Sequence, residues 1–456
     1  MTYVPDEIII KLKGTVKDTL DLMAAQVGVV KVAALFKESP RKTLSKRGTG
    51  PGTILKLSLK ENSDVEAAVQ QYQSDPRVEY AQPNYIHQIH FIPNDPDYTK
   101  QWALQKIGME QAWEYQQGSK DVLMAIIDTG IDYEHEDLKD NLWINPGEDL
   151  NGNDQVDVTD FNGLDDDGNG FVDDLRGWDF TDAPHFPDGG DYLTQDNDPM
   201  DEHGHGTSVA GIVGAVANNG IGIAGLAFGC QIMNLRAGTS RGLLEEDDVA
   251  SAIVYAVDNG ARVINMSFGD VVASPLLRDI INYAYGQNCV LVASAGNSSS
   301  DQIHYPSGFS ETISVGATDS QDFLASFSNY GSTLDVVAPG VDILTTKMGG
   351  QYDTFGGTSA SAPFVSGLAA LLLSQNPALS NEEVKGILVG STDDLGEPGW
   401  DSYYGAGRIN ALRALQVENF SLAEITFPKM DQGFAGGVLT IVGTATGALL
   451  ASYSLA

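Results

Sequence analysis

Cysteine is nearly absent from this sequence. Only Cys230 and Cys289 occur among its 456 residues, which is too few for a fold stabilised by a disulfide framework. A chain of this length has room for two or three domains and a large apolar core. Its apolar fraction of 42% is ordinary for a globular protein.

Basic residues are also scarce. The chain has 26 Lys and Arg against 62 Asp and Glu, so its formal net charge is −36, and this charge disfavours nucleic acid as a partner. Between Asp121 and Glu202 there are 25 acidic residues and two basic ones, Lys139 and Arg176. Acidic residues clustered with Asn and Gly indicate calcium binding, although a solvated acidic face is the simpler alternative.

Signals for export or membrane insertion are lacking as well. Residues Met1–Asp6 are neither basic nor apolar, so either a secretory signal has been removed from this sequence or the protein is cytosolic. A run from Gly437 onward is a candidate transmembrane helix, but its Gly and Thr residues and its missing basic flanks argue against a span. We therefore expect no membrane as a partner.

Apolar strands and helices alternate through the middle of the chain. Strands are expected at 122–127, 232–236, 262–269 and 290–294, and helices at 245–259, 276–285 and 364–373. This alternation predicts a parallel sheet covered by helices on both faces. Ser380-Asn-Glu-Glu383 predicts the capped start of a further helix.

Ser359 lies in the segment Phe355-Gly-Gly-Thr-Ser-Ala-Ser-Ala-Pro363, directly before the apolar run at residues 364–373. The pattern predicts a loop that delivers this serine to a helix N-terminus, where free backbone N–H groups and the helix dipole stabilise negative charge. Ser359 is therefore a candidate nucleophile. An N-cap serine without catalytic function is the alternative.

Two other stretches favour the catalytic interpretation. Met124-Ala-Ile-Ile-Asp-Thr-Gly-Ile-Asp132 is an apolar strand that runs into Asp128, and His205-Gly-Thr-Ser-Val-Ala-Gly211 opens a small-residue helix with a histidine. They supply an acid, a base and a nucleophile in the order Asp, His, Ser. With these motifs the chain resembles the subtilases, which are subtilisin-like serine endopeptidases.

A fourth motif, Ala293-Ser-Ala-Gly-Asn297, extends the resemblance. The resemblance implies that Ser359 attacks the scissile carbonyl, that His205 takes and returns the proton, and that Asp128 orients the histidine. It also implies that the Asn297 side chain and the Ser359 backbone N–H form the oxyanion hole. For Asn297, capping of a turn is the alternative role.

Other readings of these residues remain open from the sequence. His203 competes with His205 for the role of base. Both histidines with Asp201 could instead bind a metal ion. Asp128-Thr-Gly130 matches the active-site triplet of aspartic proteases, although that class needs two triplets. A calcium-dependent binding module with a vestigial triad is the second alternative function.

The chain is expected to form three segments. Residues 1–90 contain expected strands at 8–13, 52–59 and 78–80 and a helix at 65–74. This small α+β domain resembles the subtilase propeptide, an intramolecular chaperone and inhibitor, which is expected to be cut off between Tyr85 and Pro93. An unrelated N-terminal domain is the alternative.

Residues 91–418 are expected to form the subtilisin-like catalytic domain, an α/β domain of three layers with a mostly parallel sheet. Residues 419–456 form a short β-rich segment, with strands expected at 425–427, 437–443 and 450–455, that resembles the opening of an appended β-sandwich. In the subtilase sheet order, the strands after Cys230 and Cys289 lie three places apart, roughly 14 Å at ~4.8 Å per strand. This separation exceeds disulfide reach, so two free thiols are expected.

The resemblance also implies a secreted, self-processing zymogen that acts as a monomer on polypeptide substrates. The leading domain carries 12 basic and 10 acidic residues. Its near-neutral charge would favour pairing with the strongly acidic remainder of the chain.

Calcium is expected at two places. The segment Asp165-Asp-Asp-Gly-Asn-Gly-Phe-Val-Asp-Asp174 has the spacing of an EF-hand loop at its first five ligand positions, which are Asp165, Asp167, Asn169, the Phe171 carbonyl and Asp173. The twelfth position is Arg176 rather than Glu, so Asp174 is expected to supply the missing carboxylate. By resemblance, the second site uses Asp137, Asn219 and Asp95.

Substrate is expected to bind as an extended strand, held by main-chain hydrogen bonds. The resemblance places it between Ser267, Phe268 and Gly269 on one side and the segment from Gly242 on the other. His304 aligns with the floor of the first specificity pocket. A preference for large apolar side chains is expected there.

Overall fold

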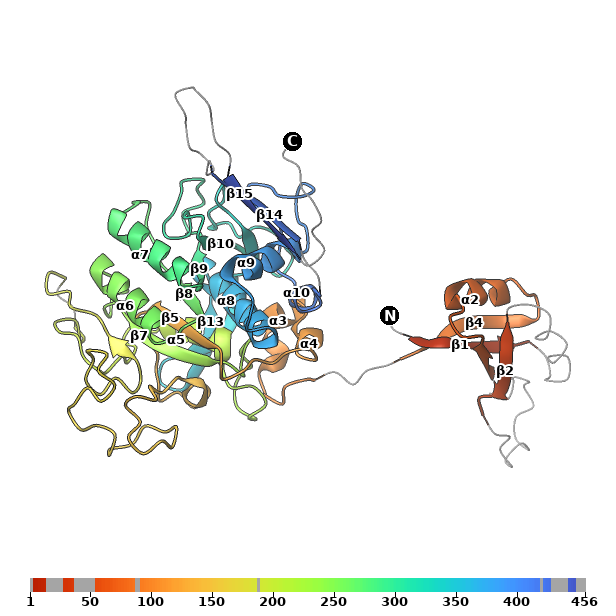
Figure 1. Cartoon of the computed structure of the whole chain (residues 1–456), viewed down its shortest axis with the longest axis horizontal. Coiled ribbons are helices and arrows are strands. Elements are labelled where there is room, and N and C mark those ends of the chain that lie inside the picture. Colours follow the sequence, from red (N-terminus) through yellow and green to blue (C-terminus); the bar gives the residue numbers. More distant parts are fainter. Residues whose placement is uncertain are drawn as a thin grey trace, which may run out of the picture. The chain divides into compact units, whose positions relative to one another are not determined.

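The computed structural model describes residues 3–13, 28–36, 54–86, 91–186, 189–418, 421–427 and 442–447. The chain divides into two compact units, Met1–Ile89 and His90–Ala456 (Figure 1). A further boundary at residue 418 stays a prediction, and the strand expected at 450–455 lies outside the described residues.

The first unit is a four-stranded antiparallel sheet with one helix. Its strand order is β2-β3-β1-β4. Alternate residues of β3 are buried, as a sheet with one covered face requires. The helix α2 starts at the cap Asp64, whose carboxylate accepts a hydrogen bond from Ala67 N. The elements are β1 (Tyr3–Leu12), β2 (Val29–Ala34), β3 (Ile54–Leu59), α2 (Val65–Gln73) and β4 (Val78–Tyr85).

The second unit is built on a seven-stranded sheet in the order β11-β10-β9-β8-β5-β7-β6. All of its strand pairs are parallel, which confirms the expected α/β class. Its strands are β5 (Leu123–Asp128), β6 (Trp178–Asp179), β7 (Gln231–Arg236), β8 (Val263–Met266), β9 (Val290–Ser294), β10 (Thr312–Thr318) and β11 (Val336–Pro339).

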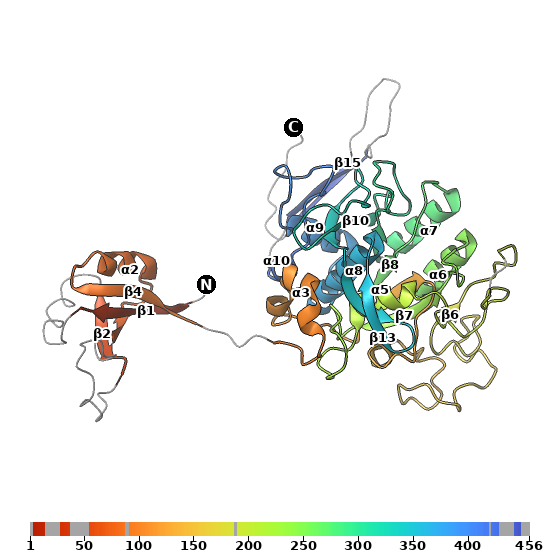
Figure 2. The same ribbon diagram turned by 180° about the vertical axis from the view of Figure 1, so that it is seen from behind.

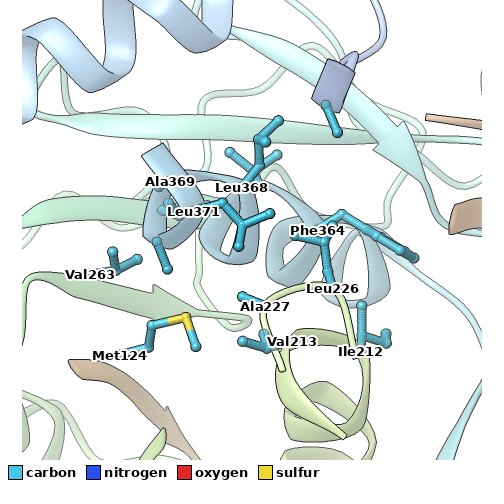
Figure 3. Close-up of a cluster of buried hydrophobic side chains, with 14 of the residues drawn as sticks. Met124, Ile212, Val213, Leu226, Ala227, Val263, Phe364, Leu368, Ala369 and Leu371 are labelled. Atoms are coloured by element: carbon cyan, nitrogen blue, oxygen red, sulfur yellow. The ribbon is translucent and has the colours of Figure 1, made fainter. Parts of the chain in front are cut away.

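Successive strand residues point into separate apolar cores on the two faces of this sheet. One core contains Met124, Ile126 and Val263 together with side chains of α5 and α8 (Figure 3). The other contains Ala125 and Ile127 with side chains of α6 and α7, two helices that lie side by side in Figure 2. Helices on both faces make three layers. The helices are α5 (His205–Gly214), α6 (Glu246–Asp258), α7 (Pro275–Gly286) and α8 (Thr358–Gln375).

Shorter elements complete this unit. Ser380 and Glu383 form the expected capping box at the start of α9. The remaining elements are η3 (Tyr98–Lys100), α3 (Trp102–Lys106), α4 (Met109–Ala112), η4 (Lys139–Asn141), the hairpin β12 (Ile343–Lys347) and β13 (Gln351–Phe355), α9 (Asn381–Gly390), α10 (Ala411–Leu415), and the antiparallel pair β14 (Ser421–Phe427) and β15 (Val442–Gly447).

Both cysteines are buried and free, which confirms the expectation of two thiols. β7 and β9, which follow them, are three places apart in the sheet. Within the described part of the chain, no helix combines the length and apolar character needed to cross a bilayer. At the position of the rejected transmembrane candidate, the described residues 442–447 form β15.

The carboxyl ends of three neighbouring strands converge at one edge of the parallel sheet. β5 ends at Asp128, β8 ends one residue before Ser267, and β9 ends three residues before Asn297. In open α/β sheets, ligands bind at this edge. The sheet therefore gathers residues that are distant in sequence.

Candidate active site

Asp128 and His205 form a direct pair. Asp128 is the buried last residue of β5, and its Oδ1 lies 2.7 Å from Nδ1 of His205. The same oxygen accepts a hydrogen bond from Thr129 N at 2.8 Å. Since a carboxylate can only accept, Nδ1 carries the hydrogen, and Nε2 of the neutral ring is left with a free lone pair.

Asp201 holds the start of α5, where His205 is the first helical residue. Its carboxylate accepts hydrogen bonds from Gly204 N at 2.8 Å and Thr207 N at 2.9 Å, and from the hydroxyls of Thr207 and Thr129. It thus satisfies N–H groups that a helix leaves unpaired at its N-terminus. From the sequence, Asp201 was predicted only as a possible metal ligand, because it lies three residues before the helix N-cap Gly204 and so gives no ordinary capping signal.

The surroundings of His205 favour its protonated form. Burial alone would lower the pKa of His205, but the charge and hydrogen bond of Asp128, with the charge of Asp201, outweigh burial and raise it above the ordinary value. The imidazole remains 24% exposed, so it is accessible to a reactant.

His203 takes a different position from His205. Its backbone N–H donates to Asp201, and its ring lies against Gly242, where an added Cβ would be 3.2 Å from Nε2. Asp128 pairs with His205 and not with His203. Among the described residues, the groups of side chains that could bind a metal ion consist of Asp and Glu and include neither His203 nor His205.

Ser359 is the second residue of α8 and is locked to the end of β8. Its hydroxyl donates to the Ser267 carbonyl at 3.0 Å, and the Ser267 hydroxyl donates to the Ser359 carbonyl at 3.1 Å. The Ser359 carbonyl is free for this bond because Pro363, four residues later, has no N–H to donate within the helix. The reciprocal bonds fix the serine at the positive end of the helix dipole.

Phe355 connects the two halves of the candidate site. It is the last residue of β13, four residues before Ser359, and its ring packs edge-on against the His205 ring with 5.2 Å between centroids. In this state the Ser359 hydroxyl is bonded to Ser267 rather than to His205. Hydrogen bonds between catalytic groups often tighten only when substrate binds.

The Asn297 amide is held in one orientation. Its Oδ1 accepts hydrogen bonds from the backbone N–H of Thr358 at 2.8 Å and from the Thr358 hydroxyl at 3.0 Å. Its Nδ2 donates to none of the described residues, and this nitrogen lies near Gly357, where an added Cβ would be 3.4 Å away. Two donors, Asn297 Nδ2 and the backbone N–H of Ser359, are thus available beside the Ser359 hydroxyl.

His304 lies between the ends of β8 and β9. An added Cβ at Gly269 would be 2.4 Å from its Cε1, and one at Gly296 would be 3.1 Å from its Cδ2. Glycine at both positions therefore leaves room for the imidazole. Burial lowers the pKa of His304, so its ring is neutral near pH 7.

The residues expected to flank the substrate lie in segments that follow the ends of sheet strands. Ser267 is buried and Phe268 packs partly against the core beneath α6 and α7. Gly242 lies in a turn with a φ of 71°, a region that favours glycine. After this turn Leu244 forms an isolated antiparallel bridge with Gly238.

The residues of the second expected calcium site also lie together. Asp95 and Asp137 are both buried. Asn219 joins them, because its backbone N–H donates to Asp95 and its Nδ2 donates to Asp137 Oδ1 at 2.7 Å. Burial, reinforced by the charge of Asp95, raises the pKa of Asp137. Two buried carboxylates joined by one asparagine are oxygen ligands of the kind that bind calcium.

The EF-hand-like spacing does not gather all of its members. Asp165 and Asp173 point to separate turns: Asp165 accepts from Gly168 N and Gly170 N, whereas Asp173 accepts from Asn162 N and Gly163 N. The remaining positions make other contacts. Asn169 Oδ1 accepts a hydrogen bond from Phe171 N, the Phe171 ring packs on Tyr255, and the Arg176 guanidinium stacks over the Tyr133 ring. Asp167 and Asp174 instead converge with Glu148, which was not among the predicted ligands.

Comparison with known proteins agrees with this geometry. Residues 119–407 match the subtilase family (Peptidase_S8), and residues 1–84 match the fervidolysin N-terminal prodomain. The chain belongs to the subtilase family. The expected resemblance and fold are thereby confirmed, and this subtilase is a subtilisin-type serine endopeptidase that carries a prodomain.

Its relatives include named serine proteases. Over 361 residues the subtilase is 38% identical to the thermophilic serine proteinase of Bacillus sp. (strain AK1), with 79% of this chain and 78% of the relative covered. It is 35% identical over 327 residues to thermitase of Thermoactinomyces vulgaris, with 72% and 100% covered. Among solved structures it is similar to a protease from Pseudoalteromonas arctica PAMC 21717, with a TM-score of 0.59, 27% identity, and 71% and 98% of the two chains covered.

Proposed function

We propose that this subtilase hydrolyses peptide bonds through Asp128, His205 and Ser359 by way of an acyl-enzyme. The observation that carries the proposal is the 2.7 Å pair of His205 with the buried Asp128 at the sheet edge. Ser359 is the second residue of α8 and lies four residues after Phe355, whose ring packs against the same imidazole. Neither an aspartic protease nor a binding module uses this combination.

In the proposed first step, the Ser359 hydroxyl leaves the Ser267 carbonyl and gives its proton to His205 Nε2 as its oxygen attacks the scissile carbonyl. The imidazolium then passes the proton to the leaving amine, and water releases the acyl group by the same route. Asp128 stays ionised and stabilises the imidazolium, in keeping with the raised pKa of His205.

The developing oxyanion would be bound by Asn297 Nδ2 and the Ser359 backbone N–H. Thr358 holds Oδ1 of Asn297, so Nδ2 is oriented before substrate arrives. Donors fixed in advance stabilise charge without the cost of reorienting solvent.

Polypeptide substrate would bind as an extended strand. Ser267, Phe268 and Gly269 would lie on one side of it and the segment from Gly242 on the other. The neutral ring of His304, seated between Gly269 and Gly296, would set the depth of the first specificity pocket. The preference for large apolar side chains remains part of the proposal.

The prodomain would act as folding assistant and inhibitor until it is cut off in an autocatalytic step, so the protein is a zymogen. Phe91 supports a cut on its N-terminal side. Its ring packs on Trp113 and Phe228, with centroids 5.9 and 5.8 Å away, and its N–H donates to Glu114. Removal of Phe91 would break these contacts, so within the expected window the cut is proposed between Tyr85 and Phe91.

Calcium would stabilise the enzyme at Asp95, Asp137 and Asn219 and within the acidic segment, by supplying positive charge to buried carboxylates. Secretion and a monomeric state complete the proposal, because the prodomain resembles the prodomains of exported subtilases.

Substitution of Ser359 tests the proposed function. Ser359→Ala should lower kcat for a peptide substrate by about 10⁶-fold, the magnitude known for a subtilisin, because the nucleophile is lost. It should also leave the full-length chain intact by mass spectrometry, whereas the unchanged enzyme releases its prodomain. A Ser361→Ala variant, which alters a buried serine of the same helix, serves as the control. Retained turnover in Ser359→Ala would contradict the triad.

A further inference from the structure

Three carboxylates of the acidic segment meet at one point. One oxygen from each of Glu148, Asp167 and Asp174 lies within 4.8 Å of the others. Glu148 and Asp174 are fully buried, with 0% of their surface exposed, whereas Asp167 reaches solvent. The cluster therefore combines buried charge with a path from the surface.

Glu148 has an oxygen that the protein leaves unpaired. Its Oε1 accepts a hydrogen bond from Asp166 N at 2.8 Å and a longer one from Asp167 N at 3.4 Å. Its Oε2 is buried and has no hydrogen-bond partner among the described residues. A buried, unpartnered carboxylate oxygen is costly, so this oxygen calls for a ligand.

The two aspartates are oriented by amides. Asn145 Nδ2 donates to Asp167 at 3.0 Å and to Asp174 at 2.7 Å, and Asn169 Nδ2 donates to the same two carboxylates at 3.1 and 2.9 Å. The Tyr255 hydroxyl of α6 donates to Asp174. No Lys or Arg is among the hydrogen-bond partners of the three carboxylates in the described structure.

A glycine permits this approach. An added Cβ at Gly147 would lie 2.4 Å from the Cβ of Asp167 and 2.6 Å from its Oδ2. Only a residue without a side chain fits here, so the backbone beside Glu148 is shaped to admit Asp167.

The chemistry of the cluster selects a hard cation. Burial first, and then neighbouring carboxylate charges, raise the pKa of both Glu148 and Asp174, so the cluster is under charge repulsion. Oxygen ligands without His or Cys favour calcium or magnesium. Three convergent carboxylates suit calcium, which takes about 6–8 oxygen ligands, better than magnesium, which keeps several waters and is held by about one or two carboxylates.

We infer that Glu148, Asp167 and Asp174 form a calcium site that fastens the acidic segment to α6 through Tyr255. The site deepens the proposed calcium dependence and rests on that proposal only for the identity of the ion. It uses Glu148 Oε2 as the free ligand and replaces the EF-hand-like set, in which Glu148 had no part. Water reaching the site beside Asp167 would complete the coordination shell.

The site would order a region with little regular structure. Figure 2 shows the yellow loops of this segment beside β6, β7 and α6. The Phe171 ring, next to the cluster, packs on Tyr255 at 4.9 Å and on Trp178 at 5.0 Å between centroids. Calcium bound to the carboxylates would therefore stabilise these aromatic contacts through Tyr255, whose hydroxyl donates to Asp174.

Substitution of Glu148 tests the site, in the full-length Ser359→Ala chain so that self-digestion cannot interfere. Metal-free protein is titrated with CaCl₂ by calorimetry and melted with and without calcium. Glu148→Gln should remove one bound ion or weaken its affinity at least about tenfold. Because Gln ends the buried charge repulsion, the metal-free variant should melt no lower than its parent, whereas with calcium the parent should melt higher.

Two further variants make the result decisive. Asp167→Asn, at an exposed position that tolerates change, should also lose affinity about tenfold. Asp154→Asn removes a charge from the same segment outside the cluster and should bind calcium as the parent does. Unchanged binding in Glu148→Gln and Asp167→Asn, or a lower melting temperature of Glu148→Gln both with and without calcium, would overturn the site. The readout involves no peptide hydrolysis, so it stands or fails separately from the triad.

Discussion

The sheet edge and the acidic segment of this subtilase hold their polar groups by different means. At the sheet edge, Asp128 ends β5, Asn297 follows β9 and Ser359 lies in the first turn of α8, and backbone groups fix them. In the segment between Asp132 and Asp201, the described regular elements are η4 and β6. There, the buried carboxylates of Glu148 and Asp174 face one another without a cationic side chain among their described hydrogen-bond partners. The first region is organised by backbone hydrogen bonds of the fold, whereas the second is where we propose that a calcium ion supplies the missing positive charge.

After Ser359→Ala, the largest effect is expected from a substitution of Asp128 at the sheet edge. Asp128→Asn should lower kcat by about 10⁴-fold, as in another serine protease triad, because the His205 tautomer is no longer fixed. Asp128 raises the pKa of His205, and the base must be unprotonated. The acidic limb of kcat/KM should therefore move to lower pH in the variant. An unmoved limb, measured from mildly acidic to neutral pH, would contradict the pairing of these residues in catalysis.

A smaller loss is expected at the oxyanion donor. Asn297→Ala should lower kcat by about 10²–10³-fold, a range established for a subtilisin, with little change in KM because the donor acts on the transition state. Steady-state kinetics on one peptide substrate measure both constants. Ser298→Ala, at the next exposed residue, is the matched control and should keep full turnover. A rise in KM alone would show that Asn297 binds substrate instead.

The acidic segment should respond in stability rather than in chemistry. Excess EDTA should lower the melting temperature of the Ser359→Ala chain by about 5–10 °C, the effect of losing an ion held at ~100 times its Kd. With the active enzyme below its melting range, the remaining turnover should keep its pH profile, since the triad contains no metal ligand. Identical melting with and without chelator would count against both proposed calcium sites.

The two regions also differ in how far the sequence predicts them. Asp128 and Asn297 were predictable because apolar strands are visible in sequence and their carboxyl ends share one edge. The shorter or less distinct strands β2, β6 and β10–β13 were not predicted. Asp201 was predicted only as a possible metal ligand, and its hydrogen bonds to the N–H groups at the start of α5 were not predicted.

In the acidic segment, spacing alone was insufficient. Asp165, Asp167 and Asp173 follow the EF-hand pattern in sequence, but backbone amides of separate turns hold Asp165 and Asp173. Glu148 joins Asp167 and Asp174 across a loop whose path depends on tertiary contacts such as those of Tyr255. Local spacing carries no information on such contacts.

Reaction with a serine-directed fluorophosphonate, followed by peptide mass spectrometry, tests the central claim most directly. The account predicts a single adduct on Ser359, formed as its oxygen displaces fluoride at phosphorus, and loss of that adduct in His205→Ala but not in His203→Ala. An adduct on another residue, or equal labelling of Ser359 without His205, would contradict it.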